Sequence, residues 1–227
     1  TYNLDPTALE RKLVQAKKDG CLPKVLVPVH LCGQPCDMAA LADLAECYGF
    51  EIIEDASHAI GARYRNESVG NCRYSSITIF SFHPVKIVTT AEGGMAMTNR
   101  GDLAERMELL RSHGITRDPA LMQGEVDGGW SYQQLDLGFN YRMTDLQAAL
   151  GVSQMTRLDA YVARRNALAQ RYDALLADLP LVTPRQLEDG LSAYHLYVIR
   201  VPHREGGISR RAIFDRMRAD GSGVNVH

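Results

Sequence analysis

The sequence predicts an α/β fold in which a mostly parallel sheet lies between helices. Three consecutive segments indicate it: an apolar run at 24–30, a helical segment from Asp37 to about Cys47, and a second apolar run at 50–54. A helix between two buried strands is typical of a parallel crossover. The composition agrees, because 45% hydrophobic and 23% charged residues over 227 positions are ordinary for a globular protein.

The first elements follow from local signals. Residues 6–18 carry apolar side chains at helical spacing. Pro28 lies inside the 24–30 run and predicts a strand end or an irregular edge there, since proline cannot donate to a ladder. Asp37 is placed to cap the next helix, and Gly49 to stop it.

The middle of the chain adds strands, a helix and a long loop. Residues 76–82 are rich in β-forming side chains, and 94–98 is predicted as their hairpin partner or neighbour. Residues 102–112 have helical spacing. The segment 114–138 is rich in Gly, Asp and Gln and predicts a long loop, which is usually functional or covered by a partner.

The last third predicts helices around a linker. Thr144 caps a long helix to about Leu179, bent near Gly151. Prolines then mark a linker, a strand is expected at 194–201, and an amphipathic helix at 209–219. We expect a domain boundary in the linker, which divides the chain into 1–180 and 181–227.

Charge and cysteine content exclude several classes of protein. Lys and Arg number 25 against 27 Asp and Glu, so a nucleic-acid-binding surface is not expected. No run approaches the ~18 apolar residues of a membrane span, and no signal peptide is visible. Five cysteines make no disulfide framework, which indicates the reducing cytoplasm. His30, Cys32 and Cys36 allow a metal site, but their spacing favours buried residues around a turn.

Two polar residues follow apolar strands at the edge where α/β proteins bind ligands. Asp55 comes after the 50–54 run, and Lys86 ends the segment Ser-Phe-His-Pro-Val-Lys after the 76–82 run. A lysine in such a place is a candidate Schiff-base amine, because burial disfavours its charged form. The alternatives remain a surface lysine beside a loop and an aspartate that caps a turn.

Four ordered motifs then resemble one family. They are Glu-Asp-Ala-Ser-His-Ala-Ile-Gly at 54–61, Ser-Phe-His-Pro-Val-Lys at 81–86, Glu-Gly-Gly at 92–94 and Gly-Phe-Asn-Tyr-Arg-Met-Thr-Asp at 138–145. Their order and spacing are similar to those of the DegT/StrS-type nucleotide-sugar aminotransferases. The resemblance covers nearly the whole chain and implies a fold-type I aminotransferase that binds pyridoxal 5′-phosphate (PLP). Residues 1–180 would be its large domain without the N-terminal part, and 181–227 the start of its small α/β domain.

The resemblance also implies roles for individual residues. Lys86 matches the lysine of the internal aldimine, and Asp55 the carboxylate that faces the pyridine nitrogen. His58 matches a contact to the ring or its 3-hydroxyl. Ser81 matches a hydroxyl that donates to the phosphate. Asn140 matches a phosphate contact supplied by the second subunit of a homodimer with shared active sites.

The implied reaction transfers an amino group from L-glutamate to C4 of a UDP-linked 4-keto-6-deoxy-N-acetylhexosamine, through pyridoxamine phosphate (PMP). Arg142 would meet the diphosphate of that substrate. His227 matches a residue near the sugar site, or is a frayed chain end. Another nucleotide keto-sugar, or a catalytically inactive fragment or regulatory member, remains open. Because the motifs start and stop inside the family pattern, we expect the chain to be an internal fragment of a longer enzyme.

Overall fold

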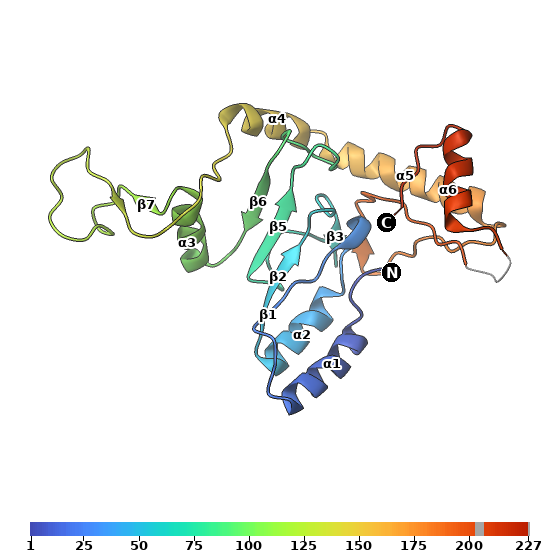
Figure 1. The fold of residues 1–227 in the computed structure, drawn as a ribbon, viewed down its shortest axis with the longest axis horizontal. Helices are drawn as coiled ribbons and strands as arrows, with labels where there is room; N and C mark the ends of the chain where they lie inside the picture. The colour runs from blue at the N-terminus through green and yellow to red at the C-terminus, as the bar shows by residue number, and fades with distance from the viewer. Residues whose placement is uncertain (203–206, 227) are drawn as a thin grey trace.

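A four-stranded sheet organises the chain. The computed structural model describes residues 1–202 and 207–226. The strand order is β1-β2-β5-β6, with the first three strands parallel and β6 antiparallel to β5 (Figure 1). Their bounds are Val25–Leu26, Glu51–Asp55, Ile77–Ser81 and Gly94–Met97. The predicted α/β class and the pairing of the 76–82 and 94–98 segments are therefore confirmed.

The two faces of this sheet differ in what covers them. Side chains alternate along each strand, and in β2 and β5 one set is buried while the other is partly or largely exposed. We call the exposed side the open face. It is defined by the residues Val27, Val29, Ile53, Asp55, Ile79 and Ser81.

Helices cover the opposite, closed face. Helices α1 (Pro6–Lys18) and α2 (Met38–Tyr48) pack on it through a core that includes Leu13, Leu41 and Ile52. A second core joins Phe80 of β5 to Val162 of α5 (Leu158–Leu176). Burial of these apolar side chains fixes which face of each strand points inward.

The local signals in the first part of the chain are confirmed. The Asp37 carboxylate accepts the backbone N–H of Ala40, and Gly49 ends α2 in the left-handed conformation with φ 73°. The strand expected at 24–30 shortens to β1. Beyond β1, Val29 makes only an isolated bridge to Asp55, as expected beside a proline.

The predicted loop at 114–138 is more ordered than expected. After α3 (Gly101–Arg111), it forms an arm that projects from the body and contains the short antiparallel strands β7 (Ile115–Thr116) and β8 (Gln133–Gln134) (Figure 1). We use the term arm for residues 114–140. A Cβ at Gly114 would lie 1.9 Å from the Asp136 carbonyl oxygen, so only glycine fits at its base.

The long helix predicted from Thr144 to Leu179 is two helices. Thr144 caps α4 (Asp145–Met155) with a complete capping box, as expected. The chain then breaks at Thr156 and Arg157, not at Gly151, and α5 ends at Leu176. The break follows a tighter turn, because the Arg157 N–H donates to the Gln154 carbonyl three residues earlier at 3.0 Å.

The strand predicted at 194–201 is wrong. Only Arg200 pairs, in an isolated bridge with Val182. The backbone of Tyr194 instead has φ 45°, and its carbonyl accepts from the Arg165 guanidinium at 2.9 Å. At Tyr194 the contact with Arg165 takes the place of the strand pairing that the sequence predicts.

Short elements complete the fold. The predicted last helix is confirmed as α6 (Arg210–Ala219), capped by Ser209. A small sheet in the order β4-β3-β9 joins two distant parts of the chain; its strands are Glu67–Ser68, Arg63–Tyr64 and Gly190–Leu191. A 3-10 turn spans Leu31–Gly33.

The division into domains at 180 stays a prediction.

Two other observations concern the whole described chain. None of its helices is both long and apolar enough to cross a membrane. All five cysteines are free thiols.

We predict that Leu41→Ala destabilises the protein strongly. Leu41 is fully buried in the α1/α2 core, and removing a leucine side chain from such a site costs about 2–5 kcal/mol. The matched control is Leu175→Ala on α5, which is 65% exposed and should change the free energy of unfolding by no more than about 0.5 kcal/mol. Urea denaturation of both variants tests this, and equal losses would contradict the assigned core.

Candidate functional site

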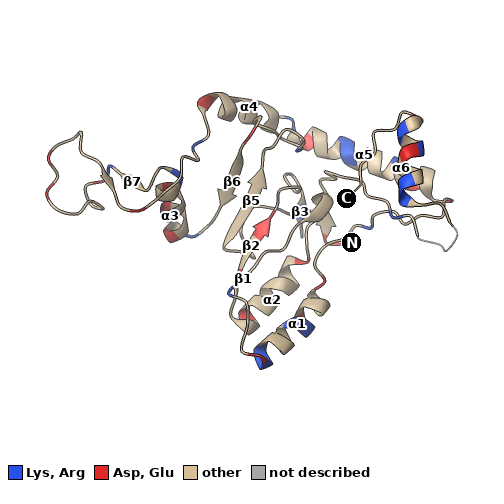
Figure 2. Cartoon of the chain, in the orientation of Figure 1, with Lys and Arg blue, Asp and Glu red and all other residues tan. Residues whose placement is uncertain are grey.

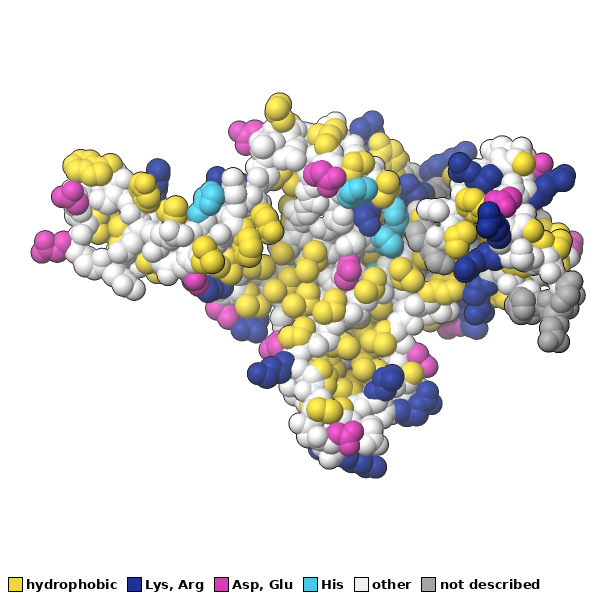
Figure 3. Space-filling view, viewed as in Figure 1, with side chains coloured by type: hydrophobic (Ala, Val, Ile, Leu, Met, Phe, Trp, Pro, Cys, Tyr) yellow, Lys and Arg dark blue, Asp and Glu magenta, His cyan; other side chains and the backbone are white. Residues whose placement is uncertain are grey.

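Two strand ends place polar side chains together on the open face. Asp55 ends β2 and pairs with Ile79 of β5, so Ser81 lies on the same face two residues further along the neighbouring strand. Of the four strands in this sheet, only β2 carries charged residues, as Figure 2 shows. Figure 3 shows apolar side chains gathered over the strands, with acidic, basic and histidine side chains close by.

Lys86 lies in the turn that follows β5. Its backbone N–H donates to the His83 carbonyl at 2.9 Å, and the next two residues, Ile87 and Val88, are buried and anchor the turn in the core. The half-buried Lys86 amine interacts electrostatically with the Asp55 carboxylate. Burial lowers the pKa of Lys86 below its ordinary value, and the Asp55 carboxylate raises it by a smaller amount.

The loop that carries Lys86 is closed by hydrogen bonds at both ends. The Phe82 N–H donates to the Gly93 carbonyl at 2.8 Å, and the Thr90 N–H donates to the Phe82 carbonyl at 3.0 Å. A Cβ at Gly93 would lie 2.3 Å from Thr90 Oγ1, so the close approach requires glycine. These contacts hold the backbone of the loop from which the Lys86 side chain extends.

The Asp55 carboxylate keeps one oxygen available. The Ser57 N–H donates to Oδ1 at 3.0 Å. Among the described residues, no donor reaches Oδ2. An acceptor that is half-buried and only partly satisfied is suited to a protonated ring nitrogen.

His58 is positioned from both sides. The Cys32 N–H donates to its Nδ1 at 3.3 Å, and its ring packs against that of His195 with centroids 4.4 Å apart. His195 could not be predicted from the sequence as a neighbour of His58, because it comes from a distant segment and no local pattern joins the two residues.

Asn140 and Arg142 lie apart from this group. Asn140 is the last residue of the arm, Arg142 lies between the arm and α4, and both are exposed. Among the described residues, no hydrogen bond or ion pair links either side chain to Asp55, Ser81 or Lys86. The first turn of α4, which follows them, lies beside the Lys86 loop, since Gln147 Nε2 donates to the Glu92 carbonyl at 3.0 Å. Their assigned roles stay predictions, and His227 lies outside the described residues.

The donor set on the open face fits PLP. The Lys86 amine, with its lowered pKa, can bond to an aldehyde carbon. The Asp55 carboxylate can face a pyridinium, and the Ser81 hydroxyl can donate to a phosphate. By contrast, no group of three His, Cys, Asp or Glu side chains in the described part of the chain is arranged to hold a metal ion.

Comparisons with known proteins agree with this chemistry. SpsC of Bacillus subtilis, a spore coat polysaccharide biosynthesis protein, is 35% identical over the whole chain, which spans 57% of its length. Helicobacter pylori PseC, an aminotransferase of pseudoaminic acid biosynthesis, is 31% identical with a TM-score of 0.80; the match covers 96% of this chain and 54% of PseC. Spr1654 of Streptococcus pneumoniae in its PMP form is 29% identical with a TM-score of 0.81, covering 100% and 60% of the two chains.

These matches have two consequences. The chain spans little more than half the length of the relatives it matches. Its fold is that of fold-type I sugar aminotransferases, and solved neighbours occur in PLP and PMP forms. A model of the DegT/DnrJ/EryC1/StrS aminotransferase family, which is PLP-dependent, matches residues 1–227. The chain belongs to the DegT/DnrJ/EryC1/StrS aminotransferase family.

Proposed function

We propose that the full protein transfers an amino group from L-glutamate to C4 of a UDP-linked 4-keto-6-deoxy-N-acetylhexosamine. The observation that carries the proposal is the placement of Asp55 at the end of β2 and of Lys86 in the turn after the neighbouring strand β5, since these groups suit the two ends of PLP. PLP supplies a carbonyl carbon that takes the amino group from the donor and passes it to the acceptor.

Lys86 binds the cofactor and then moves a proton. Burial lowers the pKa of its amine, so a larger fraction is neutral near pH 7 than for an exposed lysine. A neutral amine can take a proton at one carbon and return it at another. In this proposal Lys86 Nζ returns the proton to C4 of the sugar.

The other open-face residues orient the cofactor. The Asp55 carboxylate holds the proton on the pyridine nitrogen through a charge-assisted hydrogen bond. His58, fixed by the Cys32 N–H and the His195 ring, contacts the cofactor ring or its 3-hydroxyl. Ser81 donates to the phosphate.

The substrate assignment rests on relatives and motifs. PseC is described as an aminotransferase of pseudoaminic acid biosynthesis. Residues 30–38, 111–118 and the loop at 114–138 are similar to UDP-4-amino-4,6-dideoxy-N-acetyl-β-L-altrosamine transaminase. Arg142 suits the substrate diphosphate because a guanidinium binds phosphate oxygens in a fork, and His227 would lie near the sugar. The second candidate is amination of another nucleotide keto-sugar, favoured by the similarity to SpsC.

The proposal includes a homodimer with shared sites. Large apolar side chains on the arm and on α4 are left exposed; the largest exposures are Trp130 at 75%, Leu137 at 84% and Leu146 at 86%. Exposed apolar patches of this kind mark interfaces. A second copy that covers them would bring its Asn140 to the phosphate of this site.

Borohydride reduction of the PLP-loaded protein should attach the cofactor to Lys86. The amine is the one described lysine next to a carboxylate on the open face, and reduction makes its bond to the cofactor permanent. Mass spectrometry of the digested full-length protein locates the label. Lys86→Ala is the control and should carry none; a label on another residue of the wild-type protein would refute the assignment.

Asp55→Asn should shift the reactivity of Lys86 to lower pH in the cofactor-free protein. The Asp55 charge favours the protonated amine, so its removal lowers the pKa of Lys86 further. The pH midpoint of labelling by an amine-reactive reagent, followed on the Lys86 peptide, measures this shift. Asp43→Asn on α2 is the control and should leave the midpoint unchanged. An unchanged or higher pH midpoint in Asp55→Asn would contradict the electrostatic interaction between Asp55 and Lys86.

Mixing two inactive variants should restore activity if Asn140 acts across the dimer. A hybrid of Lys86→Ala and Asn140→Ala subunits would have one site with both defects and one intact site. Transaminase activity of the re-associated mixture, against each variant alone, measures this. If Asn140 serves its own subunit, every hybrid site carries one defect and no activity returns.

A further inference from the structure

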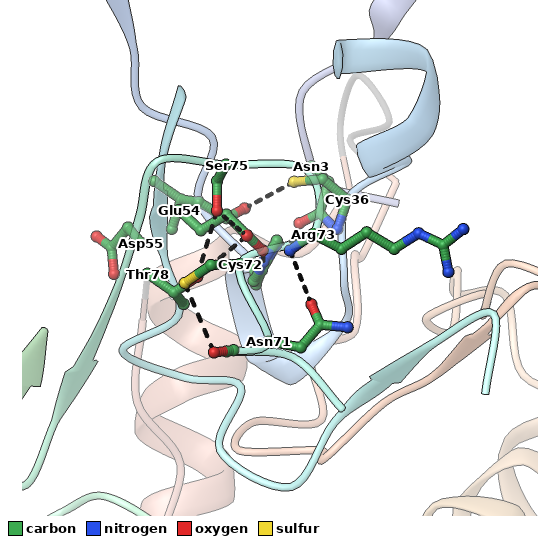
Figure 4. A network of polar contacts seen from close by, with 12 residues as sticks. Asn3, Cys36, Glu54, Asp55, Asn71, Cys72, Arg73, Ser75 and Thr78 are labelled. Atoms are coloured by element: carbon green, nitrogen blue, oxygen red, sulfur yellow. Dashed lines mark hydrogen bonds and ion pairs between the residues drawn. The ribbon is translucent and has the colours of Figure 1, made fainter. Parts of the chain in front are cut away.

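Glu54 is a buried carboxylate that the proposed chemistry does not use. It precedes Asp55 in β2, and the alternation of the strand sends the two side chains to opposite faces, as Figure 4 shows. Glu54 is only 5% exposed. A buried charge is unfavourable unless hydrogen bonds satisfy it, so the hydrogen-bond partners of Glu54 are needed to stabilise the fold around it.

Three donors satisfy the Glu54 carboxylate. His30 Nε2 donates to Oε2 at 2.8 Å. Thr78 Oγ1 donates to Oε1 at 3.1 Å, and Ser75 Oγ donates to the same oxygen. Burial raises the pKa of Glu54, but the hydrogen bonds outweigh it and the net pKa lies below the ordinary value. Glu54 is therefore an ionised carboxylate held on the closed face.

His30 is the member of this group that also touches Asp55. It is fully buried, and its Nδ1 accepts the Cys36 N–H at 3.1 Å, so the proton lies on Nε2 toward Glu54. Its backbone N–H donates to the Asp55 carbonyl at 3.0 Å. The Asp55 N–H donates in turn to the Pro28 carbonyl at 2.9 Å. One residue thus holds Glu54 by its side chain and Asp55 by its backbone.

We infer that His30 is a positioning residue that sets the protonation of the bound pyridine nitrogen by fixing Asp55 through Glu54 and the β2 backbone. The inference rests on the proposed function. Without the His30 donor, the buried Glu54 carboxylate loses a charge-assisted hydrogen bond and the end of β2 moves to recover it. The Asp55 carboxylate then no longer meets the ring nitrogen in the same geometry.

Two substitutions of His30 separate the two contacts of its ring. His30→Gln places an amide N–H at the same number of bonds from Cα as Nε2, so it keeps the donor to Glu54. His30→Asn places an amide oxygen where Nδ1 lies, so it keeps the acceptor for Cys36 and loses the donor to Glu54. Leu13→Ala, in the α1/α2 core, is the control for stability alone.

The experiment loads the full-length variants with PLP labelled with ¹⁵N in the ring. The NMR shift of the ring nitrogen reports its protonation, and titration gives the affinity for PLP. We expect His30→Asn to move the signal toward the unprotonated ring and weaken binding by at least about tenfold, the effect of losing one such hydrogen bond. His30→Gln should stay near wild type, and Leu13→Ala should lower Tm without moving the signal.

The outcomes distinguish this inference from the function it rests on. A wild-type protein that loads PLP, together with a His30→Asn variant whose ring signal and affinity are unchanged, overturns the inference and leaves the function standing. A wild-type protein that does not bind PLP overturns both. Should His30→Asn fail to fold, Glu54→Gln removes the carboxylate charge at the other end of the His30–Glu54 hydrogen bond, and an unchanged ring signal there overturns the inference in the same way.

Discussion

The alternation of side chains along β2 is the constraint on which the rest of the site depends. It buries Glu54 among His30, Ser75 and Thr78 and turns Asp55 to the open face. A slip of one residue would exchange these two carboxylates and bury the one that faces the amine. The apolar cores on the closed face prevent that slip, because Ile52 and Phe80 must remain buried.

The apolar surface of the open face strengthens the electrostatic interaction between Asp55 and Lys86. Val27, Ile53 and Ile79 lie on the same face as Asp55 and place apolar surface beside it. Electrostatic interactions are stronger where water is scarce, and a half-buried amine loses part of its preference for the charged form. The site is thus built from a loop that carries Lys86 and a strand that carries Asp55, both anchored in the same scaffold.

Local signals predicted the first part of the fold and the last helix well, and the segment around Tyr194 poorly. Helices α1 and α2 follow from periodicity, a cap at Asp37 and a stop at Gly49, all of which lie within a few residues of one another. The region around Tyr194 depends on Arg165, which no local pattern links to it. In the site, the ends of strands indicated Asp55 and Lys86 as chemical groups, but their roles came from the family motifs. His195 and the His30–Glu54 contact needed the tertiary structure.

The central claim is that Lys86 and Asp55 hold opposite ends of one PLP molecule on the open face. The most direct measurement is a crystal structure of the full-length protein grown with PLP. The account predicts continuous electron density from Lys86 Nζ into the cofactor and an Asp55 carboxylate oxygen within hydrogen-bond distance of the ring nitrogen. A cofactor bound elsewhere, or a ring nitrogen that faces a group other than Asp55, would contradict it.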